Sequence, residues 1–384
     1  MLAGVNVALG VTGSIAAVKV VELAHELRRR GASVRAVMTD SAQGIVHPWA
    51  VEFATDRSVV TEITGQVEHV ELCGRDGWAD VLLVAPATAN TVGKMAGAID
   101  DSPVTTCATT ALGADVPVVV APAMHEPMYD HPGVLDAIDR VESWGVEFVE
   151  PRIEEGKAKI ATEEAIALDV ARACSPDGFA GANVVVTSGA TSEPIDPVRL
   201  LSNRSSGKTG RAVARACYAL GADVTLVHDG PDVPYAEVAE VETAAEMTDK
   251  VLDRVEGGAA DAVVSAAAIS DYTVEAADEK IRSGRDLTLE LTPTTKLIDR
   301  VREAGDLPVV GFKAETSGDD EEMVAQARET LRRAALSFVV ANDASVMGDD
   351  LTRTLFVREN STRKYEGTKG ELGWQVAEQL ADEL

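Results

Sequence analysis

Short apolar runs alternate with amphipathic segments along the whole chain. Residues 5–9 and 34–38 are typical of buried strands, and residues 14–30 between them carry apolar side chains three and four positions apart, as a helix requires. Gly31 follows as a helix C-cap. Because the strands are apolar throughout and alternate with helices, the pattern predicts a parallel sheet covered on both faces.

The alternation stops at residues 174–178, where turn-forming residues gather, and then starts again. Further strands are predicted at residues 183–186 and 224–227, on either side of a helix. We therefore expect an α/β protein with two doubly wound, Rossmann-like domains, residues 1–175 and residues 176–384. Ligands of such sheets bind at the carboxyl ends of strands, so the turns that follow strands are the candidate sites.

The composition narrows the class of protein. Of 384 residues, 46% are hydrophobic, enough to bury two cores. The 63 acidic and 35 basic residues give a net charge of −28, which disfavours binding to nucleic acid or to an anionic membrane. No apolar stretch approaches the roughly 20 residues that cross a bilayer, and no signal-peptide pattern is present. We expect a cytoplasmic protein with an acidic surface adapted to high salt, a hypothesis that unchanged stability in low salt would refute.

The four cysteines, Cys73, Cys107, Cys174 and Cys217, are widely spaced and form no C-x-x-C pair. Their spacing matches neither a disulfide framework nor a metal site. We expect reduced and mostly buried thiols, and the sequence assigns no metal ligands.

Three strand-to-helix turns in the first half carry candidate chemistry. Residues 10–17 form a glycine-containing turn that opens the first helix, although without the G-x-G-x-x-G pattern. Residues 84–97 combine a proline with small hydroxyl and amide side chains. Residues 121–129 place two methionines and a histidine after a strand, which suits an apolar ligand with one polar contact.

Taken in order, these segments resemble the flavin-dependent cysteine decarboxylases, and phosphopantothenoylcysteine decarboxylase in particular. The resemblance rests on Gly13–Ala16, His69–Leu72, Pro86–Met95 and Pro122–Tyr129. It implies a redox-neutral decarboxylation that uses FMN, with His69 as the active-site base. The positions that it places around FMN are Gly13, Ser14, Ile15, Thr39, Thr88, Asn90 and Thr91, and those that it places at the substrate are Met124, His125 and Met128.

Two positions depart from the decarboxylase pattern. His125 stands where the family usually has asparagine, so recognition of the substrate must differ in detail. Residues 154–160 match a flap that usually supplies a cysteine as proton donor, and here they contain none. Lys157, Lys159, another thiol or water could supply that proton.

The second half carries a different set of motifs. Gly207-Lys208-Thr209 is not a phosphate-binding P-loop, because the position five residues before Gly207 is Ser202 rather than glycine. The half instead resembles phosphopantothenate–cysteine ligase. The matching segments are Glu193–Arg199, Ser202–Gly210, Ala266–Tyr272, Glu279–Ile281, Gly311–Thr316 and Val340–Asp343.

The ligase resemblance implies a two-step reaction of 4′-phosphopantothenate, L-cysteine and CTP or ATP through an acyl-nucleotidylate, with Mg²⁺ accompanying the triphosphate. Lys280 would stabilise charge on the α-phosphate, and Asn203 would hold the acyl intermediate. The remaining nucleotide positions are Ser265, Ala266, Ala267, Asp271 and Phe312. Two lysines that the family typically carries near Thr330 and Ala334 are missing, and Arg328, Arg332 or Arg333 could replace them.

Both resemblances together imply a bifunctional enzyme of coenzyme A biosynthesis that assembles as a trimer or a higher homo-oligomer. An NAD(P)-linked two-domain oxidoreductase is an alternative, with Gly10 and Gly13 at the pyrophosphate and Asp40 at a ribose. A flavin- or nucleotide-binding protein with altered catalysis is another, since the flap cysteine is missing.

Overall fold

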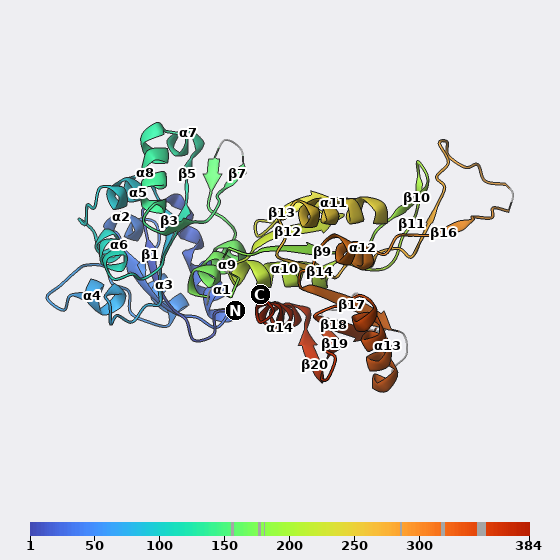
Figure 1. Cartoon of the computed structure of the whole chain (residues 1–384). Coiled ribbons are helices and arrows are strands. Elements are labelled where there is room, and N and C mark those ends of the chain that lie inside the picture. The colour runs from blue at the N-terminus through green and yellow to red at the C-terminus, as the bar shows by residue number, and fades with distance from the viewer. Residues whose placement is uncertain (155–156, 176–177, 180, 285, 316–318, 344–350) are drawn as a thin grey trace. The chain divides into compact units, whose positions relative to one another are not determined.

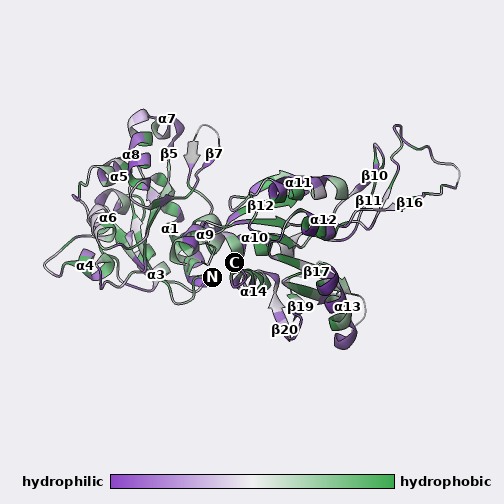
Figure 2. Cartoon of the chain, viewed as in Figure 1, coloured by the Kyte–Doolittle hydropathy of each residue, from purple (hydrophilic) through white to green (hydrophobic). Residues whose placement is uncertain are grey.

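The structure is a computed structural model of the whole chain, and it describes all residues except 155–156, 176–177, 180, 285, 316–318 and 344–350. The chain forms two compact units, Met1–Ser175 and Pro176–Leu384 (Figure 1). In both units the central strands are apolar and buried, and the helices carry polar residues on their outer faces (Figure 2). Among the described residues, no helix combines the length and apolarity that a membrane crossing needs.

The first unit is built on a parallel five-stranded sheet of order β2-β1-β3-β4-β6. Because β1 lies between β2 and β3, the connections diverge on its two sides and leave a crevice at the carboxyl ends. The fully buried β3 confirms the expected central apolar run. The strands are β1 (Asn6–Val11), β2 (Ser33–Met38), β3 (Val81–Ala87), β4 (Val118–Pro122) and β6 (Val146–Phe148).

Helices cover this sheet, and a small sheet of order β5-β8-β7 lies beside its carboxyl edge. The small sheet comprises β5 (Met124–His125), β7 (Arg152–Glu154) and β8 (Lys157–Lys159). The helices are α1 (Val20–Arg29), α2 (Asp40–Gln43), α3 (Pro48–Thr55), α4 (Glu68–Cys73), α5 (Ala89–Ala96), α6 (Pro103–Gly113), α7 (Glu126–Tyr129), α8 (Pro132–Glu142) and α9 (Glu163–Cys174).

The first helix differs from the prediction of one continuous helix over residues 14–30. The chain first forms a 3₁₀ helix, η1 (Ile15–Lys19), and α1 begins only at Val20. Ser14 caps η1 by accepting a hydrogen bond from the Ala16 backbone N–H. The tighter turn leaves Ile15 78% exposed instead of packing it on the sheet.

The second unit is built on an eight-stranded sheet of order β13-β12-β9-β14-β17-β18-β19-β20. Its strands are parallel up to β18, and β19 and β20 add the expected late antiparallel hairpin at the edge. The strands are β9 (Asn183–Thr187), β12 (Asp223–His228), β13 (Glu237–Glu240), β14 (Ala262–Ser265), β17 (Val309–Glu315), β18 (Phe338–Asp343), β19 (Leu351–Val357) and β20 (Thr362–Thr368).

Two helices of this unit pack unusually closely. A Cβ at Gly373 of α14 would lie 2.5 Å from the backbone carbonyl oxygen of Ala212 in α10, so only glycine fits at this crossing. The helices are α10 (Lys208–Ala219), α11 (Ala244–Glu256), α12 (Leu297–Ala304), α13 (Asp320–Arg333) and α14 (Lys369–Ala381).

Two hairpins extend from the second sheet as an arm (Figure 1). They are formed by β10 (Glu193–Asp196) with β11 (Arg199–Leu201), and by β15 (Tyr272–Val274) with β16 (Leu291–Pro293). The buried carboxylate of Asp196 accepts a 3.0 Å hydrogen bond from the Ile281 backbone N–H, which ties the two hairpins together.

Candidate functional site

A cavity of about 630 Å³ lies at the carboxyl edge of the first sheet, and we call it the first cavity. Its walls come from the turn after β1, the start of α5, the segment after β4 and the small sheet. The lining residues are Gly13, Ser14, Ile15, Ala16, Val18, Lys19, Thr88, Ala89, Ala123, Met124, His125, Met128, Arg152, Lys159 and Ile160. Seven residues predicted from the sequence therefore meet in one place: Gly13, Ser14, Ile15, Thr88, Met124, His125 and Met128.

Side-chain hydrogen bonds join the strand ends that form this cavity. The Thr12 hydroxyl donates to the Pro86 carbonyl oxygen at 2.7 Å and accepts from the Thr88 backbone N–H at 3.3 Å. Gly13 is needed for close approach, since a Cβ there would lie 2.4 Å from the Ser41 hydroxyl oxygen. These contacts hold the ends of β1, β2 and β3 at fixed separations.

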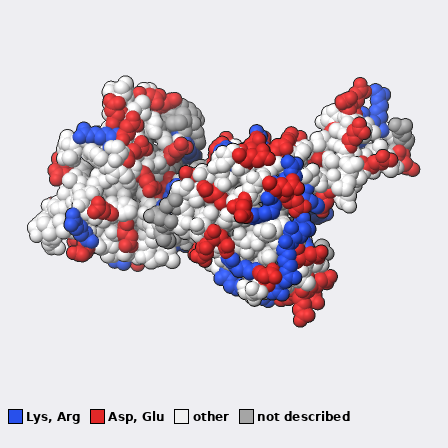
Figure 3. Space-filling view, viewed as in Figure 1, with Lys and Arg blue, Asp and Glu red and all other residues white. Residues whose placement is uncertain are grey.

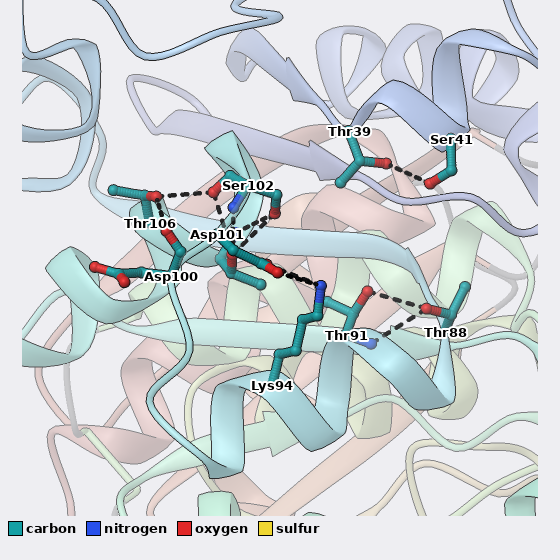
Figure 4. A network of polar contacts seen from close by, with 10 residues as sticks. Thr39, Ser41, Thr88, Thr91, Lys94, Asp100, Asp101, Ser102 and Thr106 are labelled. Carbon is teal, nitrogen blue, oxygen red and sulfur yellow. Dashed lines mark hydrogen bonds and ion pairs between the residues drawn. The ribbon is translucent and has the colours of Figure 1, made fainter.

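The remaining predicted flavin positions, Thr39, Asn90 and Thr91, are not among the residues that line this cavity, and Figure 4 shows the polar contacts of Thr39 and Thr91. The Thr91 and Thr88 hydroxyls are 3.0 Å apart at the start of α5, and Asn90 next to them is exposed. Thr39 caps α2 and lies 3.1 Å from the Ser41 hydroxyl oxygen. One turn further along α5, Lys94 forms an ion pair of 2.8 Å with Asp101.

His69 does not line the first cavity of a single chain. It lies in the first turn of α4, where its Nδ1 atom is buried and has no hydrogen-bond partner. Its neighbour Val70 is 48% exposed. Among the described residues this nitrogen is unsatisfied, which is rare for a buried polar atom.

Three basic residues that the sequence did not single out as cavity residues line its polar side: Lys19, Arg152 and Lys159. Lys159 was one of the alternatives for the missing flap cysteine, and the side chain of Lys157 lies outside the described residues. Arg152 and Lys159 come from β7 and β8, which carry too few residues for a strand pattern to be recognised.

A second cavity, of about 470 Å³, lies at the carboxyl ends of β14 and β17 in the second unit. Five predicted nucleotide positions line it: Ser265, Ala266, Ala267, Asp271 and Phe312. Residues 205–210, which form the turn before α10 and the first turn of that helix, also line this cavity. A Cβ at Gly210 would lie 2.6 Å from the Ser188 hydroxyl oxygen, so glycine lets this turn pack against the end of β9.

The two predicted catalytic residues of the second unit are placed differently. The Asn203 side-chain amide donates a 2.7 Å hydrogen bond to the carbonyl oxygen of Ala268, a residue of the cavity wall. Lys280 is exposed on the arm and does not line the second cavity. Asn203 is therefore at the rim of the second cavity, whereas Lys280 lies outside its lining.

Further residues of the second cavity have no sequence motif that would have identified them. Thr352 begins the edge hairpin and Lys369 begins α14, both far along the chain from the other lining residues. Lys296 and Arg333 also line this cavity. Among the described residues, no group of three or more His, Cys, Asp or Glu side chains is arranged to hold a metal ion.

Comparison with known proteins identifies the family. The profile described as "Flavoprotein" matches residues 1–174, and "DNA/pantothenate metabolism flavoprotein C-terminal domain" matches residues 179–384. The "Coenzyme A biosynthesis bifunctional protein CoaBC" of Thermococcus kodakarensis is 48% identical over 389 residues, covering 100% of this chain and 95% of that protein. The chain belongs to the family of coenzyme A biosynthesis bifunctional proteins CoaBC.

The CoaBC protein of Methanocaldococcus jannaschii is 34% identical, covering 99% of this chain and 94% of that protein. A crystal structure titled as the C-terminal domain of CoaBC is 28% identical, with a TM-score of 0.45, and covers 54% of this chain and 97% of that one.

Membership of the CoaBC family confirms the predicted bifunctional enzyme, a decarboxylase joined to a ligase, and the predicted α/β fold with a flavoprotein-type first domain. Family membership therefore rules out the alternative hypothesis of an NAD(P)-linked oxidoreductase. The structure agrees, since Asp40 is exposed and does not line the first cavity.

Proposed function

We propose that the second unit ligates 4′-phosphopantothenate with L-cysteine at the expense of CTP, and that the first unit decarboxylates the product to 4′-phosphopantetheine with FMN. The observation that carries the proposal is the gathering of twelve predicted positions into two cavities, seven in the first and five in the second. Each cavity lies where a doubly wound sheet binds its ligand.

The residues of the first cavity fit FMN. Ile15, Met124 and Met128 offer apolar, polarizable surface to a flat ring system. Lys19, Arg152 and Lys159, which also line this cavity, offer positive charge to phosphate and carboxylate groups. Its volume of about 630 Å³ lies within the range of roughly 300–1,000 Å³ that is typical of cofactor pockets.

When bound, FMN supplies the reversible oxidation that makes the carbon–carboxylate bond of the cysteinyl group labile. We assign to His69 the removal of a proton from the substrate, and to Lys159, in the place of the missing flap cysteine, the return of a proton at the end. His125 hydrogen-bonds the substrate from the segment after β4, where its side chain is exposed to the cavity.

We propose that the first units assemble as trimers or higher oligomers and that His69 of one protomer completes the first cavity of another. The unpartnered Nδ1 atom of His69 supports this arrangement. So do the exposed apolar side chains of the same unit, because Ile15, Trp49 and Phe53 are each more than 75% exposed.

In the second unit, the 4′-phosphopantothenate carboxylate attacks the α-phosphate of CTP and pyrophosphate leaves. The cysteine amine then displaces CMP from the acyl group. Lys280 stabilises the charge on the α-phosphate after the arm closes, and Asn203 holds the acyl intermediate at the rim. Mg²⁺ arrives with the triphosphate, since Asp271 is the one carboxylate among the described lining residues.

A coupled assay tests the proposal. The full chain is incubated in high salt with FMN, 4′-phosphopantothenate, L-cysteine, Mg²⁺ and either CTP or ATP. We expect bound flavin absorbing in the blue, and stoichiometric pyrophosphate, CO₂ and 4′-phosphopantetheine, with CTP preferred. A chain that takes up flavin and nucleotide but forms none of these products would instead be the catalytically altered binding protein.

A further inference from the structure

The described lining of the second cavity is strongly basic in an acidic protein. It contains five cationic side chains and one carboxylate, Asp271, whereas the chain as a whole has a net charge of −28. The cationic residues are Lys208, Lys296, Lys313, Arg333 and Lys369. Figure 3 shows basic side chains crossing the visible face of the second unit in the region of α12, β17 and α13. Such a concentration of positive charge attracts a multiply charged anion.

The first turn of α12 organises two of these cations. Lys296 is the N-cap residue of α12 and forms an ion pair with Asp271. Asp299, three positions later, forms an ion pair with Arg333 at the end of α13. Lys296 and Arg333 both line the cavity, so one helical turn sets the position of both charges.

Both ion pairs are open to solvent. The side chains of Lys296 and Arg333 are 55% and 49% exposed. Exposed ion pairs stabilise a fold only weakly, whereas hydrogen bonds from cations to phosphate are among the stronger ones. A phosphate group entering the cavity can therefore draw both cations away from their carboxylates at little cost.

Arg333 differs from the other arginines of α13 in its partner and in its position relative to the second cavity. Arg332 forms a 2.8 Å ion pair with Glu359, and the Arg328 guanidinium donates a 3.3 Å hydrogen bond to the Thr362 hydroxyl. Neither lines the second cavity. Of the three arginines near the missing lysines, only Arg333 is among the described residues that line the second cavity.

We propose that Lys296 and Arg333 bind the β- and γ-phosphates of the nucleoside triphosphate, and that Asp299 is a positioning residue that holds Arg333 for this contact. This inference rests on the proposed ligase function. It selects Arg333 on α13 from the three arginines that the sequence left open, and it adds Lys296, the N-cap residue of α12, which no motif marks.

Equilibrium titrations of the full chain with CTP and with CMP test this assignment, in Mg²⁺ and without 4′-phosphopantothenate or cysteine. We expect Arg333→Ala and Lys296→Ala each to raise the Kd of CTP about tenfold and to leave the Kd of CMP unchanged, because CMP lacks the β- and γ-phosphates. Arg333→Lys should retain most of the affinity. Asp299→Asn should raise the KM of CTP a few-fold at unchanged kcat, since Arg333 keeps its charge but loses its fixed position.

Arg332→Ala is the matched control, since it removes an arginine with an acidic partner from the adjacent position of the same helix, and it should leave both Kd values unchanged. Equal effects of Arg333→Ala and Arg332→Ala would overturn the proposal, as would an equal loss of CTP and CMP binding, which marks a structural role. A wild-type chain that binds no triphosphate and releases no pyrophosphate would contradict the ligase function itself.

Discussion

The Ser14 hydroxyl donates a hydrogen bond of 3.0 Å to the carbonyl oxygen of Ala123, and this contact joins the turn after β1 to the segment after β4. The Ser14 hydroxyl oxygen also accepts a 3.4 Å hydrogen bond from the Ala16 backbone N–H. Both Ser14 and Ala123 line the first cavity. One side chain thus fixes two walls of the proposed flavin site relative to each other.

We predict that Ser14→Ala weakens FMN binding about fivefold. A typical side-chain hydrogen bond contributes about 1 kcal/mol, and here its loss leaves the two walls free to separate. The measurement is a fluorescence titration of flavin-free chain with FMN. Ser143→Ala is the control, because Ser143 also donates to a carbonyl oxygen, that of Arg140, but lies at the end of α8 outside the cavity. Equal FMN affinity in the two variants would contradict the prediction.

We predict that His69→Ala and Lys280→Ala separate the two activities. Loss of a general base should reduce decarboxylation by about 10²–10⁴-fold, and loss of a charge at the α-phosphate should reduce ligation by about 10²–10³-fold. Each variant should keep the other activity, measured as CO₂ from supplied 4′-phosphopantothenoylcysteine and as pyrophosphate released.

Controls of the same residue type accompany this pair. His131→Asn replaces a histidine that caps α8, and Lys250→Ala removes an exposed lysine of α11. Neither should change either rate. If His69→Ala or Lys280→Ala abolished both activities in a folded chain, the division of labour between the units would be wrong.

The sequence predicts those parts of the sites that lie directly after a buried strand. Ala266 follows β14 and Ser14 follows β1 closely, and each lies in its cavity because parallel strands end at one edge of the sheet. Lys369 could not be predicted, because only the folded chain brings the start of α14 to a cavity formed by β14 and β17.

Local geometry also overrides the periodic pattern in places. Ile15 fits a helical apolar stripe, yet the capping bond to Ser14 tightens the first turn and turns Ile15 to the cavity side. The motif around Lys280 predicts a position at the nucleotide, yet Lys280 lies on the arm outside the second cavity, because sequence spacing does not define where the arm lies.

We predict that the thiols of the native chain are unreactive near neutral pH. Burial raises the pKa of Cys174 and of Cys217 to about 12, and a hydrogen bond with Cys73 together with burial raises the pKa of Cys107. At pH 8 a thiol with a pKa of about 12 is ionised in only about one molecule in ten thousand, and the thiolate is the reactive form.

Treatment of the native chain with iodoacetamide at pH 8 should therefore leave decarboxylation intact, and the unfolded chain should react at all four cysteines. Mass spectrometry counts the modified thiols. Rapid modification of one native thiol with matching loss of decarboxylation would show that a cysteine does serve the first cavity, against the assignment to Lys159.

We predict that His228 makes the second unit less stable below about pH 6.5. His228 ends β12, and its side chain is fully buried. Burial, and then the charge of Arg211, hold the pKa of His228 below the usual 6.5, against the opposing effects of a hydrogen bond with the Pro231 backbone and of the charges of Asp229 and Asp232. The folded chain therefore keeps His228 neutral at a pH where the unfolded chain takes up a proton.

As the pH falls from 7.5 to 5.5, this proton uptake favours the unfolded state, so wild-type stability should fall with it. His228→Gln removes the titrating group, and its unfolding midpoint in denaturant should vary less over the same range. Trp374 in α14 reports on this unit once Trp49, Trp78 and Trp144 are replaced by phenylalanine. If the unfolding midpoints of both chains depended on pH in the same way, protonation of His228 would not lower the stability of the folded state, and the prediction would be wrong.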